Sequence, residues 1–375
     1  MRVKLAILVS VCLLVLAALP LVTACTPTEE TGEETAAPTE TEAAPEVIEL
    51  GFSGLFPDAH PHGVTNQKFC DVINERTDGR VEITFYGSSL VSGPKMYQGT
   101  VQGITDMAMT CPLYVSGRFP ASELFELPRE VPNAWVNGQV YDDFYRHFEP
   151  EEFDDTHVLY MHGPGHAVFQ SNVKVSKPED LKGMVIRSSG TSAEVVKAWG
   201  GTPRAMEMGE AYEALSKGVV DANFAYLDTL HGWKHAEVVD YVTKLPVSAS
   251  SCQCVVMNKD KWNSLPADIQ EIFTETSEEF RDLQAMTWVY LDHLGLEYFQ
   301  GLEGREYIEI PEEERPLWEE PLQPVLENYI EEKTAMGLPA EEYMEYVEER
   351  TEYHIANQPT EEECIETVES EILNK

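Results

Sequence analysis

Basic side chains are scarce in this sequence. Lysine and arginine together number 26, against 66 aspartate and glutamate residues, so the formal net charge of the 375-residue chain is −40. A protein of this charge repels the phosphate backbone of nucleic acids, which excludes DNA and RNA as partners. It also repels small anions at long range, so an anion site must be a local, partly buried positive spot.

Cysteine is also scarce, with seven residues in the chain, and the spacing of zinc ligands, CxxC, does not occur. Cys252 and Cys254 lie two positions apart in a predicted strand, which places both on one face as small apolar residues. Apart from Cys12 and Cys25 near the N-terminus, the cysteines are odd in number, so we expect no disulfide framework: Cys70, Cys111, Cys252, Cys254 and Cys364.

Long apolar runs are absent except at the start, where residues 5–19 follow Arg2 and Lys4 and are interrupted only by Ser10. This arrangement is typical of a signal peptide. The run is shorter than the about 20 residues that a membrane-spanning helix needs. We therefore expect residues 1–24 to be a signal peptide and no later segment to span a bilayer.

The segment that follows, residues 21–25 (LVTAC), resembles the lipobox of bacterial lipoproteins. In lipoproteins the signal peptidase cuts before the cysteine, which then carries acyl chains whose CH2 groups each contribute roughly 0.8 kcal/mol of membrane affinity. We therefore expect Cys25 to be lipidated and to anchor the protein. The alternative is an ordinary secretory signal in which this cysteine occurs by chance.

Residues 26–46 contain no aromatic and no basic side chain. Such a segment cannot bury enough apolar surface to offset its chain entropy, and its acidic charges repel one another. Residues 25–46 are therefore predicted to form a disordered acidic tether behind the lipidated cysteine.

The remaining residues alternate between strand and helix patterns. Strands are predicted at residues 47–53, 81–86 and 106–110, with helices at 64–76 and 96–103 between them. A second run of the same kind has strands at residues 158–161, 185–187 and 219–224 and helices at 190–199 and 212–217. Two such βα runs indicate two lobes.

The chain then returns through a strand at residues 252–258 to a helix pattern over residues 267–299. At about 1.5 Å per residue this helix is roughly 50 Å long, more than one small domain needs, so it is expected to bridge the two lobes. Beyond Pro311, apolar residues at helical spacing predict surface helices: Leu317, Trp318, Leu322, Val325, Leu326, Tyr329 and Ile330.

Six short motifs, taken in their order and spacing, resemble the substrate-binding subunits of tripartite ATP-independent periplasmic (TRAP) transporters. The motifs are residues 77–81 (TDGRV), 103–107 (GITDM), 117–120 (GRFP), 178–187 (PEDLKGMVIR), 212–221 (YEALSKGVVD) and 257–259 (MNK). The resemblance implies an α/β fold of two lobes, like other periplasmic binding proteins, joined by crossing hinge strands and a long bridging helix.

The resemblance also implies the organisation and the role of the chain. Lobe I and the hinge are expected in residues 47–161 and 255–285, lobe II in residues 162–254, and the end of the long helix with C-terminal helices in residues 286–375. Such a protein, expected to be a monomer, captures a small organic acid outside the cytoplasm and delivers it to integral membrane subunits.

In the family, the arginine that ends the strand after the DLKG motif grips the ligand carboxylate, and here this position is Arg187. A planar guanidinium offers two parallel N–H bonds to a carboxylate, which a lysine cannot match. The alternative for Arg187 is a structural salt bridge. Arg118, in a turn before Pro120, is predicted to be structural.

Where many relatives carry a second basic contact, this chain has residues 163–166 (GPGH), without an arginine. This departure indicates a monocarboxylate or another weakly charged ligand, with His166 as a hydrogen-bond donor or as a structural histidine.

Relatives often show GQEN where this chain has residues 222–228 (ANFAYLD), so the pocket wall is altered. Phe224 and Tyr226 are expected either to cover an apolar or aromatic ligand body or to belong to the core. The other ligand-binding positions that the resemblance suggests are Ser53, Tyr97, Met208 and Asn223.

Two other classes of function are alternatives to a receptor for organic acids. A metal-binding solute receptor is suggested by Asp58, His60 and His62, with His162 and His166 elsewhere. A Ca²⁺ ion that bridges the carboxylate through Asp228 is a variant of the main hypothesis. An enzyme is disfavoured, because the chain lacks GxSxG, HExxH and a phosphate-binding glycine loop. We therefore expect no catalysis and no cofactor.

Overall fold

The computed structural model describes residues 47–87, 91–247 and 249–374, and all of them belong to one compact unit. The predicted signal peptide, the lipidation site Cys25 and the acidic tether lie outside the described residues. In the described ranges, no helix is both long enough and apolar enough to cross a membrane.

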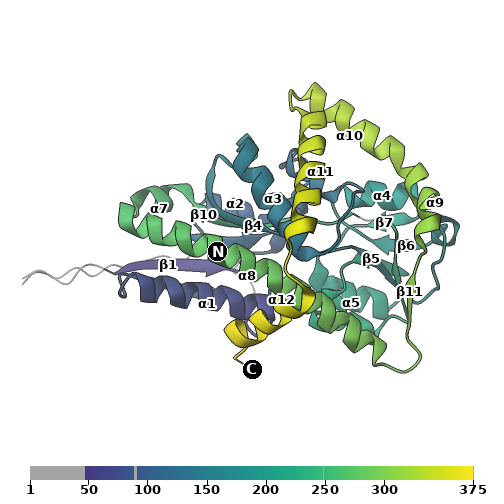
Figure 1. Ribbon diagram of the computed structural model, residues 1–375, viewed down its shortest axis with the longest axis horizontal. Coiled ribbons are helices and arrows are strands. Elements are labelled where there is room, and N and C mark those ends of the chain that lie inside the picture. The colour runs from purple at the N-terminus through teal and green to yellow at the C-terminus, as the bar shows by residue number, and fades with distance from the viewer. Residues whose placement is uncertain (1–46, 88–90, 248, 375) are drawn as a thin grey trace, which may run out of the picture. The chain divides into compact units, whose positions relative to one another are not determined.

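The first lobe is built on a five-stranded sheet with the order β2-β1-β3-β10-β4 (Figure 1). Strand β1 pairs in parallel with β2 and β3, whereas β10 is antiparallel to both β3 and β4. The strands are β1 (Ile48–Ser53), β2 (Val81–Tyr86), β3 (Met107–Thr110), β4 (Thr156–His162) and β10 (Gln253–Asn258).

Helices α1 (Pro61–Arg76), α2 (Gly93–Val101) and α3 (Ala134–Phe148) accompany this sheet. The sequence predicts the first of them to begin at residue 64, but it begins one turn earlier. Proline is favoured in the first turn of a helix, and His60 caps the helix because its Nδ1 accepts a hydrogen bond from the backbone N–H of His62.

The second lobe is built on a six-stranded sheet with the order β11-β9-β5-β8-β6-β7. Strand β6 is parallel to β7 and β8, and β5 is antiparallel to β8 and β9. Helices α4 (Ser192–Ala198) and α5 (Met208–Ser216) follow β6 and β7 along the chain. The strands are β5 (Val168–Ser171), β6 (Val185–Arg187), β7 (Thr202–Arg204), β8 (Ala222–Ala225), β9 (Tyr241–Lys244) and β11 (Glu306–Glu309).

Strand β11 is a departure from the sequence prediction, which expects only helices after residue 286. Its four residues pair in parallel with β9, so the chain returns to the second sheet after the long helix. The segment is short and both of its ends are exposed glutamates, Glu306 and Glu309. An edge strand of this length has too little apolar alternation to be recognised in a sequence.

Two strand-to-strand crossings connect the sheets of the two lobes, one between β4 and β5 and the other between β9 and β10. They run side by side, because Ser250 Oγ donates to the carbonyl oxygens of Pro164 and Gly165, both at 2.9 Å. The Asn137 amide joins both crossings by donating to Pro164 O at 2.8 Å and to Ser251 O at 3.0 Å. Residues 163–166 are therefore part of this hinge.

Helix α8 (Ala267–Gln300) confirms the predicted long helix, and Figure 1 shows it passing along both sheets. It packs against α1 and α3 of the first lobe and against α6 (Asp228–Gly232) of the second. Its approach to α6 requires a glycine, since a Cβ on Gly295 would lie 2.0 Å from the Leu227 carbonyl oxygen.

The predicted C-terminal helices are present, and α11 packs on α3 while α12 packs on α8. Helix α11 is held by Asp143, whose carboxylate accepts from Arg350 Nε at 2.7 Å and contacts His354 Nε2 at 2.7 Å. The helices after β10, apart from α8, are α7 (Lys259–Ser264), α9 (Arg315–Glu319), α10 (Gln323–Ala335), α11 (Ala340–Asn357) and α12 (Glu361–Thr367).

The cysteines of the described chain are all free and buried. Cys252 and Cys254 belong to one hydrophobic cluster of the first lobe, together with Phe119 and Tyr141. The prediction that these two cysteines are small apolar core residues is confirmed.

Candidate ligand-binding pocket

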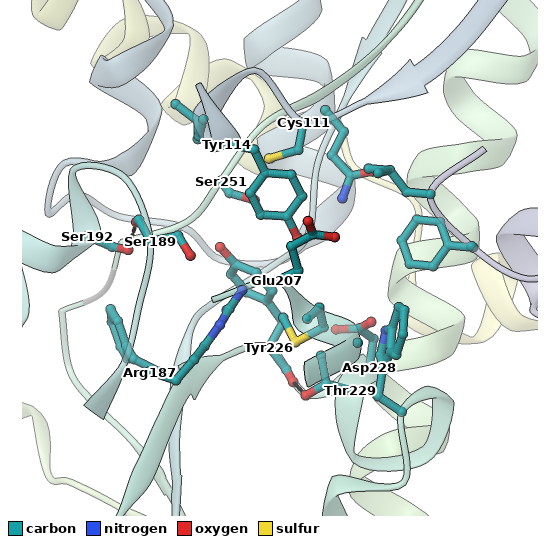
Figure 2. A pocket seen from close by; sticks show the side chains of 18 of the residues that line it. Cys111, Tyr114, Arg187, Ser189, Ser192, Glu207, Tyr226, Asp228, Thr229 and Ser251 are labelled. Carbon is teal, nitrogen blue, oxygen red and sulfur yellow. Dashed lines mark hydrogen bonds between the residues drawn. The ribbon is translucent and has the colours of Figure 1, made fainter. Parts of the chain in front are cut away.

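A pocket with an empty volume of about 830 Å³ lies between the two lobes (Figure 2). Its walls come from the segments that follow β1 and β3 in the first lobe and β6 and β8 in the second, and from α8. Ligand sites of α/β proteins commonly lie at the carboxyl ends of parallel strands. The lining consists of Leu55, Phe56, Cys111, Leu113, Tyr114, Glu126, Arg187, Ser189, Ser192, Glu207, Met208, Gly209, Phe224, Tyr226, Asp228, Thr229, Trp233, Ser251, Gln253 and Trp288.

Arg187 is the last residue of β6 and is 5% exposed. Its Nε and Nη2 donate to the carbonyl oxygen of Met206 at 3.2 and 3.0 Å. In the described ranges no carboxylate forms an ion pair with Arg187, so no acidic residue there supports the alternative of a structural salt bridge. The backbone carbonyl fixes the orientation of the guanidinium, and N–H groups remain that suit a carboxylate of a ligand.

Three acidic side chains share the lining with this single cation: Glu126, Glu207 and Asp228. Burial raises the pKa of Glu126 to about 8. Burial and the neighbouring Asp292 raise the pKa of Asp228 well above the ordinary value of a carboxyl group. A buried carboxyl group without a counter-charge favours the neutral form, so Glu126 and Asp228 act as neutral hydrogen-bonding groups in the pocket.

Hydroxyl groups and aromatic rings make up much of the remaining wall. Burial raises the pKa of Tyr114 to about 12, so its phenol is a neutral hydrogen-bonding group. The ring of Phe224 packs on Phe169 and Trp199, with centroid distances of 4.9 and 5.7 Å, while Phe224 also lines the pocket. Both interpretations of Phe224, as a core residue and as a wall of the pocket, therefore describe its position.

Four of the predicted ligand-binding residues lie in this lining: Arg187, Met208, Phe224 and Tyr226. The residues of greatest chemical interest that the sequence did not reveal are Glu126, Glu207, Ser189, Trp233 and Trp288. Ser189 follows Arg187 by two positions, so its closeness in sequence to the predicted arginine could have indicated that it lines the pocket. Trp288 lies on the predicted apolar side of the long helix, where it cannot be distinguished from core residues by its spacing.

The other predicted residues are outside this lining, and each has partners in the protein. Ser53 Oγ donates to Thr105 Oγ1 at 3.2 Å, and Tyr97 donates to Asp155 at 2.5 Å. The Asn223 amide contacts Gln170 and His235 in the second lobe, and His166 borders different hollows beside the hinge. A role of these four side chains in ligand binding stays a prediction.

Arg118 has a structural position, as the sequence predicts. Its Nη2 forms an ion pair with Asp155 at 2.7 Å, and its Nη1 donates to the carbonyl oxygen of Glu152 at 3.0 Å. The guanidinium also lies over the rings of Tyr97 and Phe119.

Three of the four histidines of the metal-binding hypothesis, His60, His62 and His162, belong to an aromatic cluster in the first lobe, whereas His166 lies beside the hinge. His60 and His62 lie against Phe56, with ring centroids 4.6 and 4.7 Å away, and His162 Nδ1 accepts a hydrogen bond from Trp288 Nε1 at 3.0 Å. Burial lowers the pKa of His60 to about 4 and that of His162 to about 3. Across the described ranges, no group of three or more histidine, cysteine, aspartate or glutamate residues is arranged to hold a metal ion.

Comparison with protein families gives a match over residues 52–333 to the model described as bacterial extracellular solute-binding protein, family 7 (DctP). The chain is 26% identical to the C4-dicarboxylate-binding periplasmic protein DctP of Rhodobacter capsulatus, over 77% of this chain and 88% of the relative. It is 27% identical to the 2,3-diketo-L-gulonate-binding periplasmic protein YiaO of Escherichia coli, over 59% of this chain and 69% of the relative. These relatives are named for organic acids, so they give the metal-binding hypothesis no support.

Solved structures give the same picture of the fold. A TRAP periplasmic solute-binding protein from Desulfovibrio salexigens superimposes with a TM-score of 0.74 at 25% identity, covering 84% of this chain and 98% of that protein. A TRAP solute-binding protein from Rhodoferax ferrireducens, in complex with copurified benzoate, has a TM-score of 0.78 at 21% identity, covering 83% and 99% of the two chains. The predicted two-lobed α/β fold is confirmed.

Proposed function

Because the chain belongs to family 7 of the bacterial extracellular solute-binding proteins, we propose that it binds a small carboxylate outside the cytoplasm and delivers it to the membrane subunits of a TRAP transporter. The observation that carries this proposal is Arg187, a buried guanidinium in the wall of the interlobe pocket with a backbone carbonyl as its protein partner. A buried cation of this kind is favoured by an anionic partner.

We propose further that the ligand carries one carboxylate rather than two. Arg187 is the single cationic side chain in the lining of this pocket. A second carboxylate in the same space would lie among Glu126, Glu207 and Asp228 and would find no second cation in the lining to compensate the loss of its hydration. The segment at residues 163–166, where many relatives place another basic contact, packs into the hinge in this protein.

Capture without chemical change is the activity that we propose, because binding requires the pocket and its arginine but no nucleophile or general base. The functional unit of this proposal is a monomer. We also propose that the lobes, divided as the sequence predicts, close over the ligand about the two crossings and α8. Closure would present an occupied receptor to the membrane subunits.

We also propose that the mature protein is held at the outer side of the membrane, in the periplasm or on the cell surface, by Cys25. The residues 21–25 and the acidic segment behind them support this proposal. A lipid anchor with an extended tether would keep the folded unit near the transporter while leaving it free to rotate.

The test of the proposed function begins with mass spectrometry of small molecules released by denaturing the purified protein. The released acid is then titrated into ligand-free protein in a calorimeter. We expect a saturable heat with one site per chain and recovery of the acid unchanged after prolonged incubation. A released compound without a carboxylate, or its conversion into a product, would contradict the proposal.

A further inference from the structure

Arg187 and Asp228 lie at two separate places in the pocket lining. Figure 2 shows Arg187 on one side of the pocket and Asp228 on the other. Arg187 belongs to the end of β6, and Asp228 is the first residue of α6, after β8. A ligand that bridges the pocket therefore meets a cation at one end and a carboxyl group at the other.

Asp228 has an unused hydrogen-bond acceptor. The residue is 1% exposed, and its Oδ1 atom is buried without a hydrogen-bond partner. Its backbone N–H donates to Asp292 Oδ1 at 3.0 Å, so a second acidic side chain lies close to it. Over the ranges described, no lysine, arginine or histidine forms an ion pair with either aspartate. Leaving a buried acceptor unpaired is costly, which indicates that a ligand group completes this site.

Aromatic rings share the lining with Asp228. Phe56, Trp233 and Trp288 all line the pocket, and the ring centroid of Phe56 lies 6.2 Å from that of Trp233 and 5.7 Å from that of Trp288. The faces of aromatic rings attract ammonium groups, and tryptophan does so most strongly. A carboxyl group beside several rings is the combination that stabilises a desolvated ammonium cation.

We propose that the ligand is a zwitterion, with its carboxylate on Arg187 and a protonated or quaternary amine against Asp228, Trp233 and Trp288. This inference rests on the proposed function and specifies its ligand. The amine gives Asp228 the counter-charge that the protein does not supply. It also explains why a receptor for an organic acid places Asp228 in the same lining as Arg187.

The electrostatics of Asp228 agree with this assignment. Burial raises the pKa of Asp228 well above its ordinary value, so without ligand the carboxyl group avoids an uncompensated charge. A neighbouring ammonium group favours the ionised carboxylate. Binding of a protonated amine therefore replaces a neutral, poorly paired acid by a charge-assisted hydrogen bond, and binding of a quaternary amine replaces it by an ion pair.

The test uses compounds that share a skeleton and differ only at one end. On the four-carbon skeleton the probes are butanoate, butanedioate, 4-aminobutanoate and 4-(trimethylammonio)butanoate. On the aromatic skeleton they are benzoate, terephthalate and 4-(aminomethyl)benzoate. Affinities are measured by calorimetry with ligand-free wild-type protein. We expect the ammonium member of at least one series to bind about 10-fold or more tightly than its partners, since hydrogen bonds to charged groups contribute about 1.5–3 kcal/mol.

The decisive variant is Asp228→Asn, which keeps the size of the side chain and removes its charge. It should lower the affinity for the preferred ammonium compound by about 10- to 100-fold and leave that for the matching monocarboxylate nearly unchanged. Asp71→Asn is the matched control, because Asp71 is exposed on α1, outside the pocket lining. Melting temperatures of the ligand-free proteins show whether both variants are folded.

The outcomes separate this inference from the proposed function. Equal or tighter binding of a monocarboxylate or dicarboxylate overturns the zwitterion and leaves the carboxylate receptor standing. Unchanged ammonium affinity in a folded Asp228→Asn protein also overturns it. Absence of binding by every ammonium compound overturns the zwitterion as well. If the native ligand recovered by mass spectrometry carries no carboxylate, the proposed function also fails.

Discussion

The carboxylate of Glu126, in the first lobe, accepts a hydrogen bond from the backbone N–H of Thr191, the residue that precedes α4 in the second lobe. The contact is close: a Cβ on Gly190 would lie 2.2 Å from a Glu126 carboxyl oxygen, and Gly190 adopts a positive φ of 61°. A side chain at position 190 would displace Glu126 and strain the backbone. Glu126 thus links the lobes at the edge of the pocket.

This link predicts that Glu126 favours the closed arrangement of the lobes. Glu126→Ala removes the acceptor, and the loss of a buried hydrogen bond of about 0.5–1.5 kcal/mol should weaken ligand affinity by roughly 3- to 10-fold. Small-angle scattering of the ligand-free variant should give a larger radius of gyration than wild type. Glu126→Gln keeps an acceptor oxygen and should resemble wild type in both measurements. An unchanged radius in Glu126→Ala would show that the contact does not govern closure.

Arg187 is expected to dominate the affinity for the carboxylate. Truncating one partner of a buried, hydrogen-bonded charge pair costs about 2–5 kcal/mol, so Arg187→Ala should bind roughly 30-fold to several thousand-fold more weakly by calorimetry. Arg187→Lys should restore the affinity only in part, because lysine lacks the planar pair of donors.

The control for Arg187 is His166→Gln, since His166 borders hollows beside the hinge and not the interlobe pocket. Its affinity should equal that of wild type. Near-normal affinity in a folded Arg187→Ala protein, with the loss appearing in His166→Gln instead, would transfer the carboxylate site to the hinge.

The buried histidines predict a loss of stability in mild acid. Burial lowers the pKa of His162 to about 3 and that of His235 to about 3. The unfolded chain binds protons at these positions below about pH 6.5, whereas the folded chain does not, so the free energy of unfolding falls as the pH drops from 6.5 toward 3. Between pH 7 and pH 5, one such histidine contributes a loss of about 2 kcal/mol.

Urea unfolding of His162→Asn at both pH values tests this assignment. Asparagine offers an oxygen near the position of Nδ1, which accepts from Trp288, but it does not titrate. We expect a smaller difference between the two pH values than in wild type. His293→Gln, at an exposed position of α8, should keep the wild-type difference. Equal pH dependence in wild type and His162→Asn would refute the assignment.

Lipidation at Cys25 predicts a change of compartment. Cys25→Ser cannot carry the acyl chains, so the protein should move from the membrane fraction to the soluble extracytoplasmic fraction. Immunoblots of fractionated cells measure this, with Cys364→Ser, a buried cysteine of α12, as the control that stays in the membrane fraction. Wild-type fractionation of the Cys25→Ser protein would exclude Cys25 as the anchor.

Much of the architecture follows from local patterns in the sequence. The predicted strands at residues 81–86 and 185–187 have the same bounds as β2 and β6, and the predicted long helix differs from α8 by one residue. Alternation with period two and apolar spacing with period 3.6 are local properties of the sequence, so strands and helices can be predicted from them without knowledge of the fold. Arg187 is predicted from the resemblance of residues 178–187 to the family motif, and it lies in the pocket lining.

The pocket itself depends on contacts between distant parts of the chain. Glu126 contacts Thr191, and Trp288 of α8 lines the same cavity as Asp228 of α6. Asp228 belongs to the altered segment at residues 222–228, but no motif marks Glu126, Thr191 or Trp288. Conversely, Ser53, Tyr97 and Asn223 occur at positions that the motifs suggest, yet each side chain turns toward a partner in its own lobe. The sequence determined which elements form, since that depends on neighbours along the chain. Only the tertiary structure decided which side chains face the pocket, because this depends on how the two lobes and α8 meet.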